Sequence, residues 1–270
     1  MRCLFCKQDS SLSRSVEHII PESLGGLSHT LPSGVVCDRC NNYFSHSVEK
    51  PFLESEAIEL LRFNEVVVSK KGRVPPVRGI LSPGHFPVTL YRNLRADPEM
   101  LLDIPPEAVH DVLQLKSGAI ILPSEAQFPS GLLVSRFLAK VALEAMAQKL
   151  VLHPDGLEYL VDEIQLDPIR NHARRGDIQD WPVHIRRIYP SREKWTDESN
   201  REVQVVNEFD ILTTVKNEWY FVLALFGTEL VINYGGPETE GYQQWLDEDN
   251  GASPLYSGKN SNDFRLRRSS

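Results

Sequence analysis

The feature that most constrains this chain is the placement of its four cysteines. They form two Cys-x-x-Cys pairs, Cys3/Cys6 and Cys37/Cys40, and the 270-residue sequence contains no other cysteine. Two residues between thiolates allow a tight turn to direct both sulfur atoms at one ion, and two such turns supply the four ligands of a tetrahedral site. We therefore predict a structural Zn²⁺ on these four cysteines, which closes the segment between them at its base.

Two other uses of paired cysteines fit this sequence less well. The N-terminus carries charged and polar residues directly after Cys6, without the apolar core of a signal peptide. We therefore expect the protein in the cytoplasm, where thiols stay reduced and disulfides are rare. A redox-active Cys-x-x-Cys would not need a second pair.

No apolar run approaches the roughly 18 residues that span a bilayer, so we expect no membrane contact.

An acid–histidine pair, Glu17-His18, lies between the two cysteine pairs. It is followed by Ile-Ile-Pro and by the turn Gly25-Gly26, and Asn41 comes directly after Cys40. In this order and spacing the segment resembles the HNH, or ββα-metal, endonucleases. The resemblance is to the subset with two zinc-binding Cys-x-x-Cys pairs, which includes phage endonuclease VII and bacterial defence HNH proteins, and it covers about residues 1–50.

The resemblance implies roles for three residues. Glu17 and Asn41 would hold a catalytic Mg²⁺ or Mn²⁺, and His18 would activate the attacking water. The chemistry agrees, because phosphodiester hydrolysis needs a base and a cation that neutralises charge on the phosphoryl and leaving oxygens. An imidazole titrates near neutral pH, and carboxylate and amide oxygens suit Mg²⁺ or Mn²⁺.

Three departures from the family pattern stand in this segment. Glu17 occupies a position where Asp is commoner. The middle Asn of the family name is missing, because residues 30–34 read Thr-Leu-Pro-Ser-Gly. The last position is Asn41 and not His. Asn42 is an alternative ligand, and His46 would then lie one helical turn beyond it, within reach of the metal.

Net charge is -8, which by itself does not favour a nucleic-acid protein. The distribution matters more, because residues 62–95 carry seven basic residues and one acid. Candidate DNA contacts are Arg39, Lys70, Lys71, Arg73, Arg170, Arg174 and Arg175. The alternatives are a solvated face for the basic stretch, and pairing with the acidic C-terminal region for the last three arginines.

Beyond the cysteine-rich segment, the pattern predicts an α+β fold. We expect helices from Pro51 to Arg62, from Leu132 to Leu152 and from Asp167 to Arg175, the second being the core helix. Lys140 on that helix is more readily explained as a snorkelling or an ion-paired lysine than by a functional role. Expected strands are residues 66–68, 77–81, 183–189, 202–214, 219–226 and 228–233, the last four forming an antiparallel meander against the long helix, and residues 255–270 read as a loose tail.

These observations predict a zinc-stapled ββα-metal (HNH) module over residues 1–63, followed by an α+β domain over 64–270 that positions DNA, dimerises or senses a trigger. The functional hypothesis is a metal-dependent HNH endonuclease, acting on DNA in preference to RNA, in prokaryotic restriction or anti-phage defence. A homodimer would supply two sites for a double-strand break, and a ligand or protein partner could activate the enzyme. The alternative is a non-catalytic zinc module that binds nucleic acid or a partner.

Overall fold

The computed structural model forms two compact units, which are described separately. Residues 1–52 and 130–270 form one unit, the core unit, and residues 53–129 form the other, the inserted unit. The structure describes residues 1–26, 29–69, 71–94, 99–123, 128–129, 131–176, 180–191, 193, 195–196, 202–203, 207–255 and 267–268. Lys70, one of the predicted DNA contacts, lies outside the described residues.

The N-terminal part of the core unit has the ββα order that the resemblance predicts. Strands β1 (Glu17–His18) and β2 (Thr30–Leu31) pair antiparallel. They are followed by a helix that begins as α1 (Asp38–Phe44), passes through a π-helical turn η2 (Ser45–Glu49) and ends as α2 (Lys50–Leu53). Pro51 lacks an N–H, so the helical hydrogen-bond pattern must change near it.

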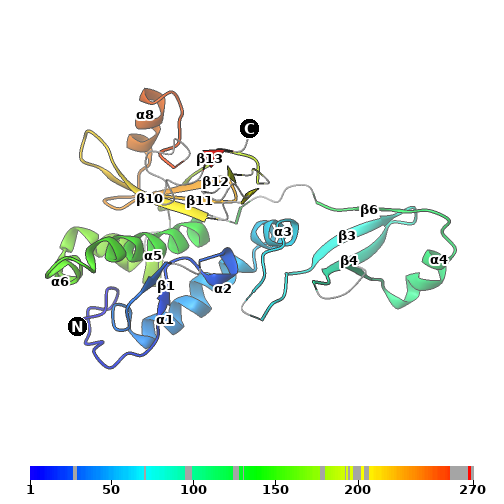
Figure 1. Cartoon of the computed structure of the whole chain (residues 1–270), viewed down its shortest axis with the longest axis horizontal. Coiled ribbons are helices and arrows are strands. Elements are labelled where there is room, and N and C mark those ends of the chain that lie inside the picture. Colours follow the sequence, from blue (N-terminus) through cyan, green and yellow to red (C-terminus); the bar gives the residue numbers. More distant parts are fainter. Residues whose placement is uncertain are drawn as a thin grey trace. The chain divides into compact units, whose positions relative to one another are not determined.

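The rest of the core unit is a sheet packed on one long helix. Helix α5 (Gly131–Leu150) lies against the four-stranded antiparallel sheet β10-β11-β12-β7 (Figure 1). The Tyr234 hydroxyl donates a 2.7 Å hydrogen bond to the carbonyl of Ala142 and joins the two layers. The strands are β7 (His184–Arg187), β10 (Asn207–Thr213), β11 (Trp219–Leu225) and β12 (Thr228–Asn233).

Helix α5 is buried on nearly all sides because it serves two neighbours. Besides the sheet, it contacts η2 and β2 of the N-terminal part, and Phe137 stacks on Phe52 with ring centroids 3.9 Å apart.

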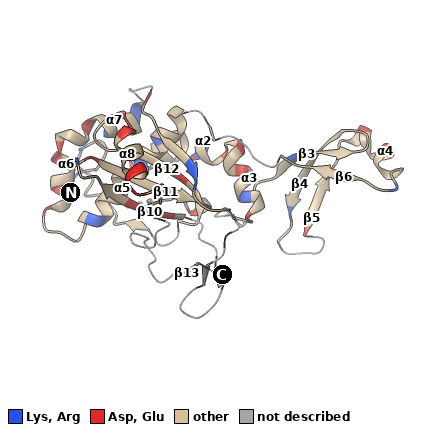
Figure 2. Cartoon of the chain, turned by 90° about the horizontal axis from the view of Figure 1, so that it is seen from above, with Lys and Arg blue, Asp and Glu red and all other residues tan. Residues whose placement is uncertain are grey.

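The remaining elements are η1 (Glu22–Leu24), α6 (Gly156–Asp162), η4 (Ile164–Leu166), α7 (Asp167–Arg175), α8 (Glu240–Glu248), and a small sheet of β8 (Trp195–Thr196), β9 (Glu202–Val203) and β13 (Arg267–Arg268). Acidic and basic residues are interspersed on the helices of this unit (Figure 2).

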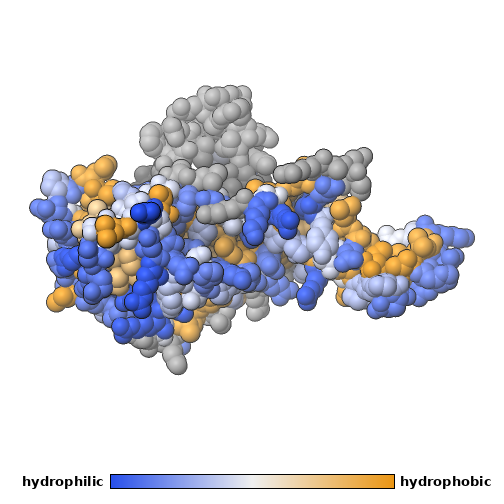
Figure 3. Space-filling model, turned by 90° about the horizontal axis from the view of Figure 1, so that it is seen from below, coloured by the Kyte–Doolittle hydropathy of each residue, from blue (hydrophilic) through white to orange (hydrophobic). Residues whose placement is uncertain are grey.

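The inserted unit has its own core and its own sheet, in the order β5-β4-β3-β6. One sheet face and helix α3 bury apolar residues that include Phe63, Val77 and Leu90. On the other face Ile80 and Tyr91 are 44% and 42% exposed, and hydrophobic residues are visible on this unit at the right of Figure 3. Its elements are α3 (Glu56–Asn64), β3 (Val77–Ser82), β4 (Phe86–Arg92), β5 (Met100–Asp103), η3 (Pro106–Ala108), α4 (Val109–Leu113) and β6 (Ala119–Ile121).

The structure confirms the α+β class, the long helix, the helix ending before Gly176 and an antiparallel meander of β10, β11 and β12. The first strand of the predicted four-stranded meander, β7, does not lie beside β10 but pairs with β12. Several details were wrong. Residues 66–68 form no strand, and Val66 has a positive φ of 58° that a strand does not allow. The stretch 202–214 is not one strand, because β9 and β10 belong to different sheets. Arg267–Arg268 in the expected tail pair with β8.

The expected helix from Pro51 to Arg62 is interrupted. It is divided between α2 and α3, since Ser55 is extended and begins a new helix. The division of the chain at residue 63 stays a prediction. The two compact units of the structure are instead bounded after residues 52 and 129. Among the described residues, no helix combines the length and apolar character that crossing a membrane requires.

Candidate functional site

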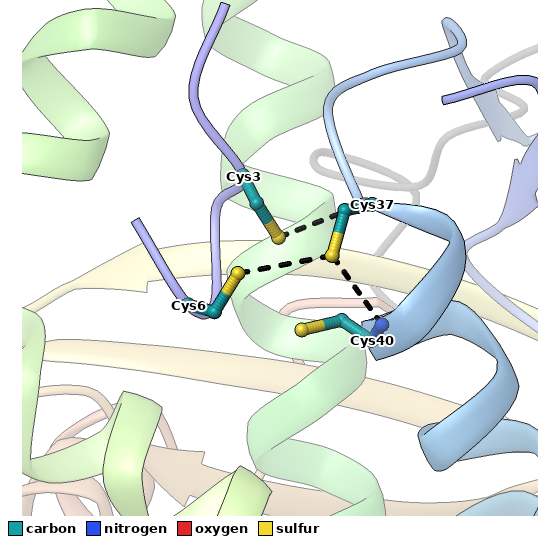
Figure 4. Close-up of side chains that lie close together, drawn as sticks. All are labelled: Cys3, Cys6, Cys37 and Cys40. Atoms are coloured by element: carbon teal, nitrogen blue, oxygen red, sulfur yellow. Dashed lines mark hydrogen bonds between the residues drawn. The ribbon is translucent and has the colours of Figure 1, made fainter. Parts of the chain in front are cut away.

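The four cysteines meet at one point, as their spacing predicts. Their Sγ atoms all lie within 4.8 Å of one another, and those of Cys6 and Cys37 are 3.7 Å apart (Figure 4). A tetrahedral zinc ion with Zn–S bonds of about 2.3 Å requires sulfur atoms about 3.8 Å apart. The Sγ atom of Cys37 also accepts a hydrogen bond from the N–H of Cys40 and caps helix α1. This cluster is therefore a group able to hold Zn²⁺.

The ionisation of the thiols supports this interpretation. A hydrogen bond from Cys40 lowers the pKa of the Cys3 thiol to about 4. The same hydrogen bond, together with burial, raises the pKa of Cys40 far above its usual value, and burial raises the pKa of Cys6. Without a cation, ionisation of Cys3 is therefore favoured and that of Cys40 and Cys6 is disfavoured. A divalent cation is what would let all four sulfur atoms ionise together.

Arg170 anchors the first cysteine turn to the rest of the core unit. Its guanidinium is 2% exposed and donates to the carbonyls of Leu4 and Leu160, each at 2.8 Å, and to Asp167. Leu4 lies between Cys3 and Cys6, so this arginine holds the first cysteine turn against α6 and α7. A buried guanidinium with these partners is placed for a structural role and not for contact with DNA.

His18 lies at the end of β1 with both ring nitrogens in contact with named groups. Its Nδ1 is 3.0 Å from the carbonyl oxygen of Gly26, and its Nε2 is 2.9 Å from Oε1 of Glu22. A carbonyl can only accept, so Nδ1 carries the proton in this contact. The nitrogen that faces Glu22, Nε2, is then the one that can take up or release a proton.

The Gly25-Gly26 turn has a physical reason in this arrangement. Gly25 has φ 79°, a left-handed conformation that ends η1 and that glycine adopts without strain. A Cβ on Gly26 would lie 1.8 Å from the carbonyl oxygen of Ile20, so no other residue fits there without a shift. The turn thus brings the Gly26 carbonyl next to the His18 ring.

Glu17 faces the opposite side of β1, toward helix α5. Its side chain is buried, and Oε1 accepts a 2.7 Å hydrogen bond from Nζ of Lys140. The same ammonium lies 2.5 Å from Oε1 of Glu49 and 2.9 Å from Oε2 of Glu144. The other oxygen of Glu17, Oε2, is buried and has no hydrogen-bond partner among the residues that the structure describes.

The charges in this cluster influence one another strongly. Burial lowers the pKa of Lys140, but the carboxylates of Glu144, Glu49 and Glu17 outweigh burial and raise it well above the usual 10.5. Burial raises the pKa of Glu144 well above its usual value, in spite of the nearby ammonium. Lys140 is therefore a permanent cation, and of the two explanations that the sequence favours it is the ion-paired lysine.

The other predicted ligands lie along α1 and η2. Asn41 is partly exposed, and Asn42 and His46 are exposed. Asn41 begins the second turn of α1, directly after Cys40 of the cysteine cluster. The cluster therefore fixes the position of the Asn41 backbone. The structure gives no contact between Asn41 and Glu17, and the choice between Asn41 and Asn42, with His46 as an added ligand, stays a prediction.

The predicted basic contacts are distributed over both units. In the core unit, Arg39 on α1 and Arg175 at the end of α7 are exposed, and Arg174 is partly exposed. Tyr43 on α1 donates a hydrogen bond to the carbonyl of Arg174 and so joins α1 to α7. Arg136 on α5 donates a 2.7 Å hydrogen bond to the Tyr43 hydroxyl. In the inserted unit, Lys71 and Arg73 are exposed at a turn.

Comparison with known proteins agrees with this geometry. Residues 3–56, or 54 of the 270 residues, match the family model described as HNH endonuclease. The N-terminal part of the chain is therefore an HNH module that contains the four cysteines, Glu17, His18 and Asn41. No curated protein and no solved structure matches the chain significantly.

Three residues around Glu17 and His18 could not be found from local sequence. Glu22 lies four residues after His18, a spacing that on its own does not distinguish it from any surface glutamate. Glu49 and Glu144 reach the cluster only because η2 and α5 pack together. The usable signal was the pair Lys140 and Glu144, two charged residues four apart in the apolar central part of helix α5.

Proposed function

We propose that this protein is a metal-dependent HNH endonuclease that hydrolyses phosphodiester bonds, with DNA as its preferred substrate. The observation that carries the proposal is His18, whose Nδ1 is held by the Gly26 carbonyl within a segment that matches the HNH endonuclease model. A histidine oriented in this way by a backbone carbonyl is suited to act as a general base.

His18 would act through Nε2. With Nδ1 donating to Gly26, Nε2 is the nitrogen that accepts the proton of the attacking water. Nε2 lies 2.9 Å from Oε1 of Glu22. A carboxylate only accepts hydrogen bonds, so Glu22 would give up this contact while water occupies Nε2 and would accept from Nε2 once the imidazolium has formed. Glu22 would thus stabilise the charge that His18 gains, while the Gly26 carbonyl on Nδ1 holds the ring orientation.

Two metals are implied, and the residues fit each of them. The cysteine cluster suits structural Zn²⁺, for which four nearby sulfur atoms are the ordinary ligands. Glu17 and Asn41, with His46 as an added ligand, would hold Mg²⁺ or Mn²⁺. Oε2 of Glu17, which has no hydrogen-bond partner among the described residues, fits a cation ligand. That cation would supply charge stabilisation at the phosphate and the leaving oxygen.

The proposed nucleic-acid surface is revised by the structure. Arg39, Arg174 and Arg175 remain candidates on the core unit, since α1 and α7 are joined through Tyr43. Lys71 and Arg73 remain candidates on the inserted unit, and Arg170 is withdrawn because it is buried. We also propose a cytoplasmic protein of prokaryotic defence, acting as a homodimer, with a ligand or partner as its trigger.

The test is cleavage of supercoiled plasmid by zinc-loaded protein with Mg²⁺ or Mn²⁺. We expect the wild-type protein to nick the plasmid and His18→Ala to lower the nicking rate by at least about 100-fold, the usual effect of removing a general base. His110→Ala, in an exposed helix of the inserted unit, is the matched control and should leave the rate unchanged. Single-stranded RNA of similar length, cleaved more slowly than the plasmid, would support DNA as the substrate. Equal nicking by His18→Ala would overturn the assignment.

A second function, binding without cleavage, is favoured by one observation. Oε1 of Glu17 already accepts from a buried lysine, as an acid with a purely structural role would. Under this alternative the protein retards plasmid in a gel without nicking it at any concentration of Mg²⁺ or Mn²⁺, and no factor from infected cells restores cleavage.

A further inference from the structure

We propose that Lys140 is a positioning residue of the nuclease site, which fixes the acid–histidine pair from helix α5. The inference rests on the proposed endonuclease function. It adds a residue 122 positions beyond His18, outside the segment that matches the HNH endonuclease model.

One ammonium group contacts both members of the pair. Nζ of Lys140 donates to Oε1 of Glu17 at 2.7 Å and to the carbonyl oxygen of His18 at 3.3 Å. A third contact, to Oε1 of Glu49 at 2.5 Å, holds the turn that continues helix α1. Lys140 therefore joins the two parts of the HNH module, the strand and the helix, at one point of α5.

The direction of the Glu17 carboxylate follows from these contacts. A glutamate at the end of a short strand has several rotamers, and the ammonium selects the one that places Oε1 on Nζ. Oε2 is then the oxygen left without a partner among the described residues, so it is the one available to a cation. The same contact to the His18 carbonyl limits rotation of the strand that carries the base.

The energetics explain why the lysine is retained in the interior. Lys140 is fully buried, and a buried charge is costly unless paired. An apolar residue in its place would leave the buried Glu17 and Glu144, and the partly buried Glu49, without that cation. Replacing an entire buried ion pair by apolar residues is often neutral or stabilising, so stability alone does not demand this cluster. Fixing the geometry of the site is a reason for it.

The experiment compares Lys140→Met and Lys140→Arg with Lys149→Met. Lys149 lies on the same helix, is half exposed and pairs only at the surface with Asp210 at 2.5 Å, so it is a matched control. Two readouts are taken on zinc-loaded protein: the nicking rate at saturating Mn²⁺, and amide hydrogen exchange of the segment 15–26 without Mn²⁺.

We expect Lys140→Met to lower the nicking rate per zinc-loaded molecule at least about tenfold with little change in KM for DNA. Exchange should rise in the segment 15–26 and not in β11 of the sheet. Lys140→Arg should restore part of the rate and of the protection, and Lys149→Met should match wild type. A uniform rise in exchange with an unchanged rate per folded molecule would mean that Lys140 only stabilises the fold, and would overturn the proposal.

Lys140→Met leaves Glu17, Glu49 and Glu144 without their cation, so the double variant Lys140→Met/Glu144→Leu is made alongside it to remove one of the two buried acids. If this variant binds zinc and shows wild-type exchange in the segment 15–26, the inference is wrong. Wild-type protein that does not nick, either alone or with a factor from infected cells, would overturn the endonuclease function instead, while the exchange comparison still decides whether Lys140 fixes the strand.

Discussion

At the scale of single residues, the site combines short-range contacts with contacts over very long separations in sequence. Gly26 reaches His18 across eight residues, and Lys140 reaches Glu17 across 123. The first kind is visible in the sequence, because a Gly-Gly turn after an acid–histidine pair has a fixed spacing. The second kind is not, because no local pattern states which helix will pack against β1.

Arg170 gives a prediction at this scale. Arg170→Met removes hydrogen bonds to the carbonyls of Leu4 and Leu160 and to Asp167. Because the carbonyls would stay buried without a donor, we expect a loss on the order of 3 kcal/mol in the free energy of unfolding, measured with urea. Arg175→Met, on the exposed side of the same helix, should change stability little. An equal effect of both variants would show that Arg170 does not anchor the first cysteine turn.

The predicted residues differ in how firmly the sequence placed them. The four cysteines were predicted as a cluster and the structure brings them together, since a Cys-x-x-Cys turn carries its own geometry. Arg170 was predicted as a DNA contact together with Arg174 and Arg175 because all three lie in one basic helix. Only tertiary packing decides which face of that helix is buried, and Arg170 lies on the buried face.

At the scale of elements, the C-terminal sheet carries a buried acid whose ionisation can be tested. Glu208 on β10 accepts a 2.8 Å hydrogen bond from the Tyr189 hydroxyl, and burial, with a further contribution from Glu229, raises the pKa of Glu208 above its usual 4.5. The folded chain therefore keeps this proton at pH values where the unfolded chain has lost it. Its contribution to stability is complete below about pH 4.5 and is lost as the pH rises through the folded-state pKa.

Glu208→Gln removes this dependence while it keeps an acceptor for Tyr189. We expect the variant to gain stability relative to wild type as the pH rises from about 4 to about 7, measured as the difference between their urea midpoints. Comparing the two proteins at each pH cancels the other titrating groups. A difference that stays constant over this range would contradict the raised pKa of Glu208.

Long, strongly patterned elements were predictable and short ones were not. The helix of 20 residues and the strands β10 to β12 have enough apolar residues for their period to be read. Strands β1 and β2 have two residues each, too few for any period, and only the family resemblance predicted them. The prediction of a strand at residues 66–68 failed for the opposite reason. Three consecutive valines favour a strand, but no strand among the described residues pairs with them.

At the scale of the whole molecule, the division into units leads to a test with fragments. Residues 53–129 bury a core of their own, so this fragment should unfold cooperatively in a thermal melt. A fragment of residues 1–63 lacks α5, and with it Phe137 and Lys140, so it should bind zinc without protecting the amides of β1. Circular dichroism and hydrogen exchange measure both. A stable, protected 1–63 fragment would support the division at residue 63 that the sequence predicts.

Helix α5 also gives the nuclease site an order of assembly during synthesis. Glu17 leaves the ribosome 123 residues before Lys140, a delay of about 12 s at roughly 10 residues per second. A chain whose translation stops within that interval contains the acid–histidine pair and the cysteines but not the lysine that orients the pair. Under the proposed function, incomplete products that lack Lys140 are therefore expected to be poor nucleases.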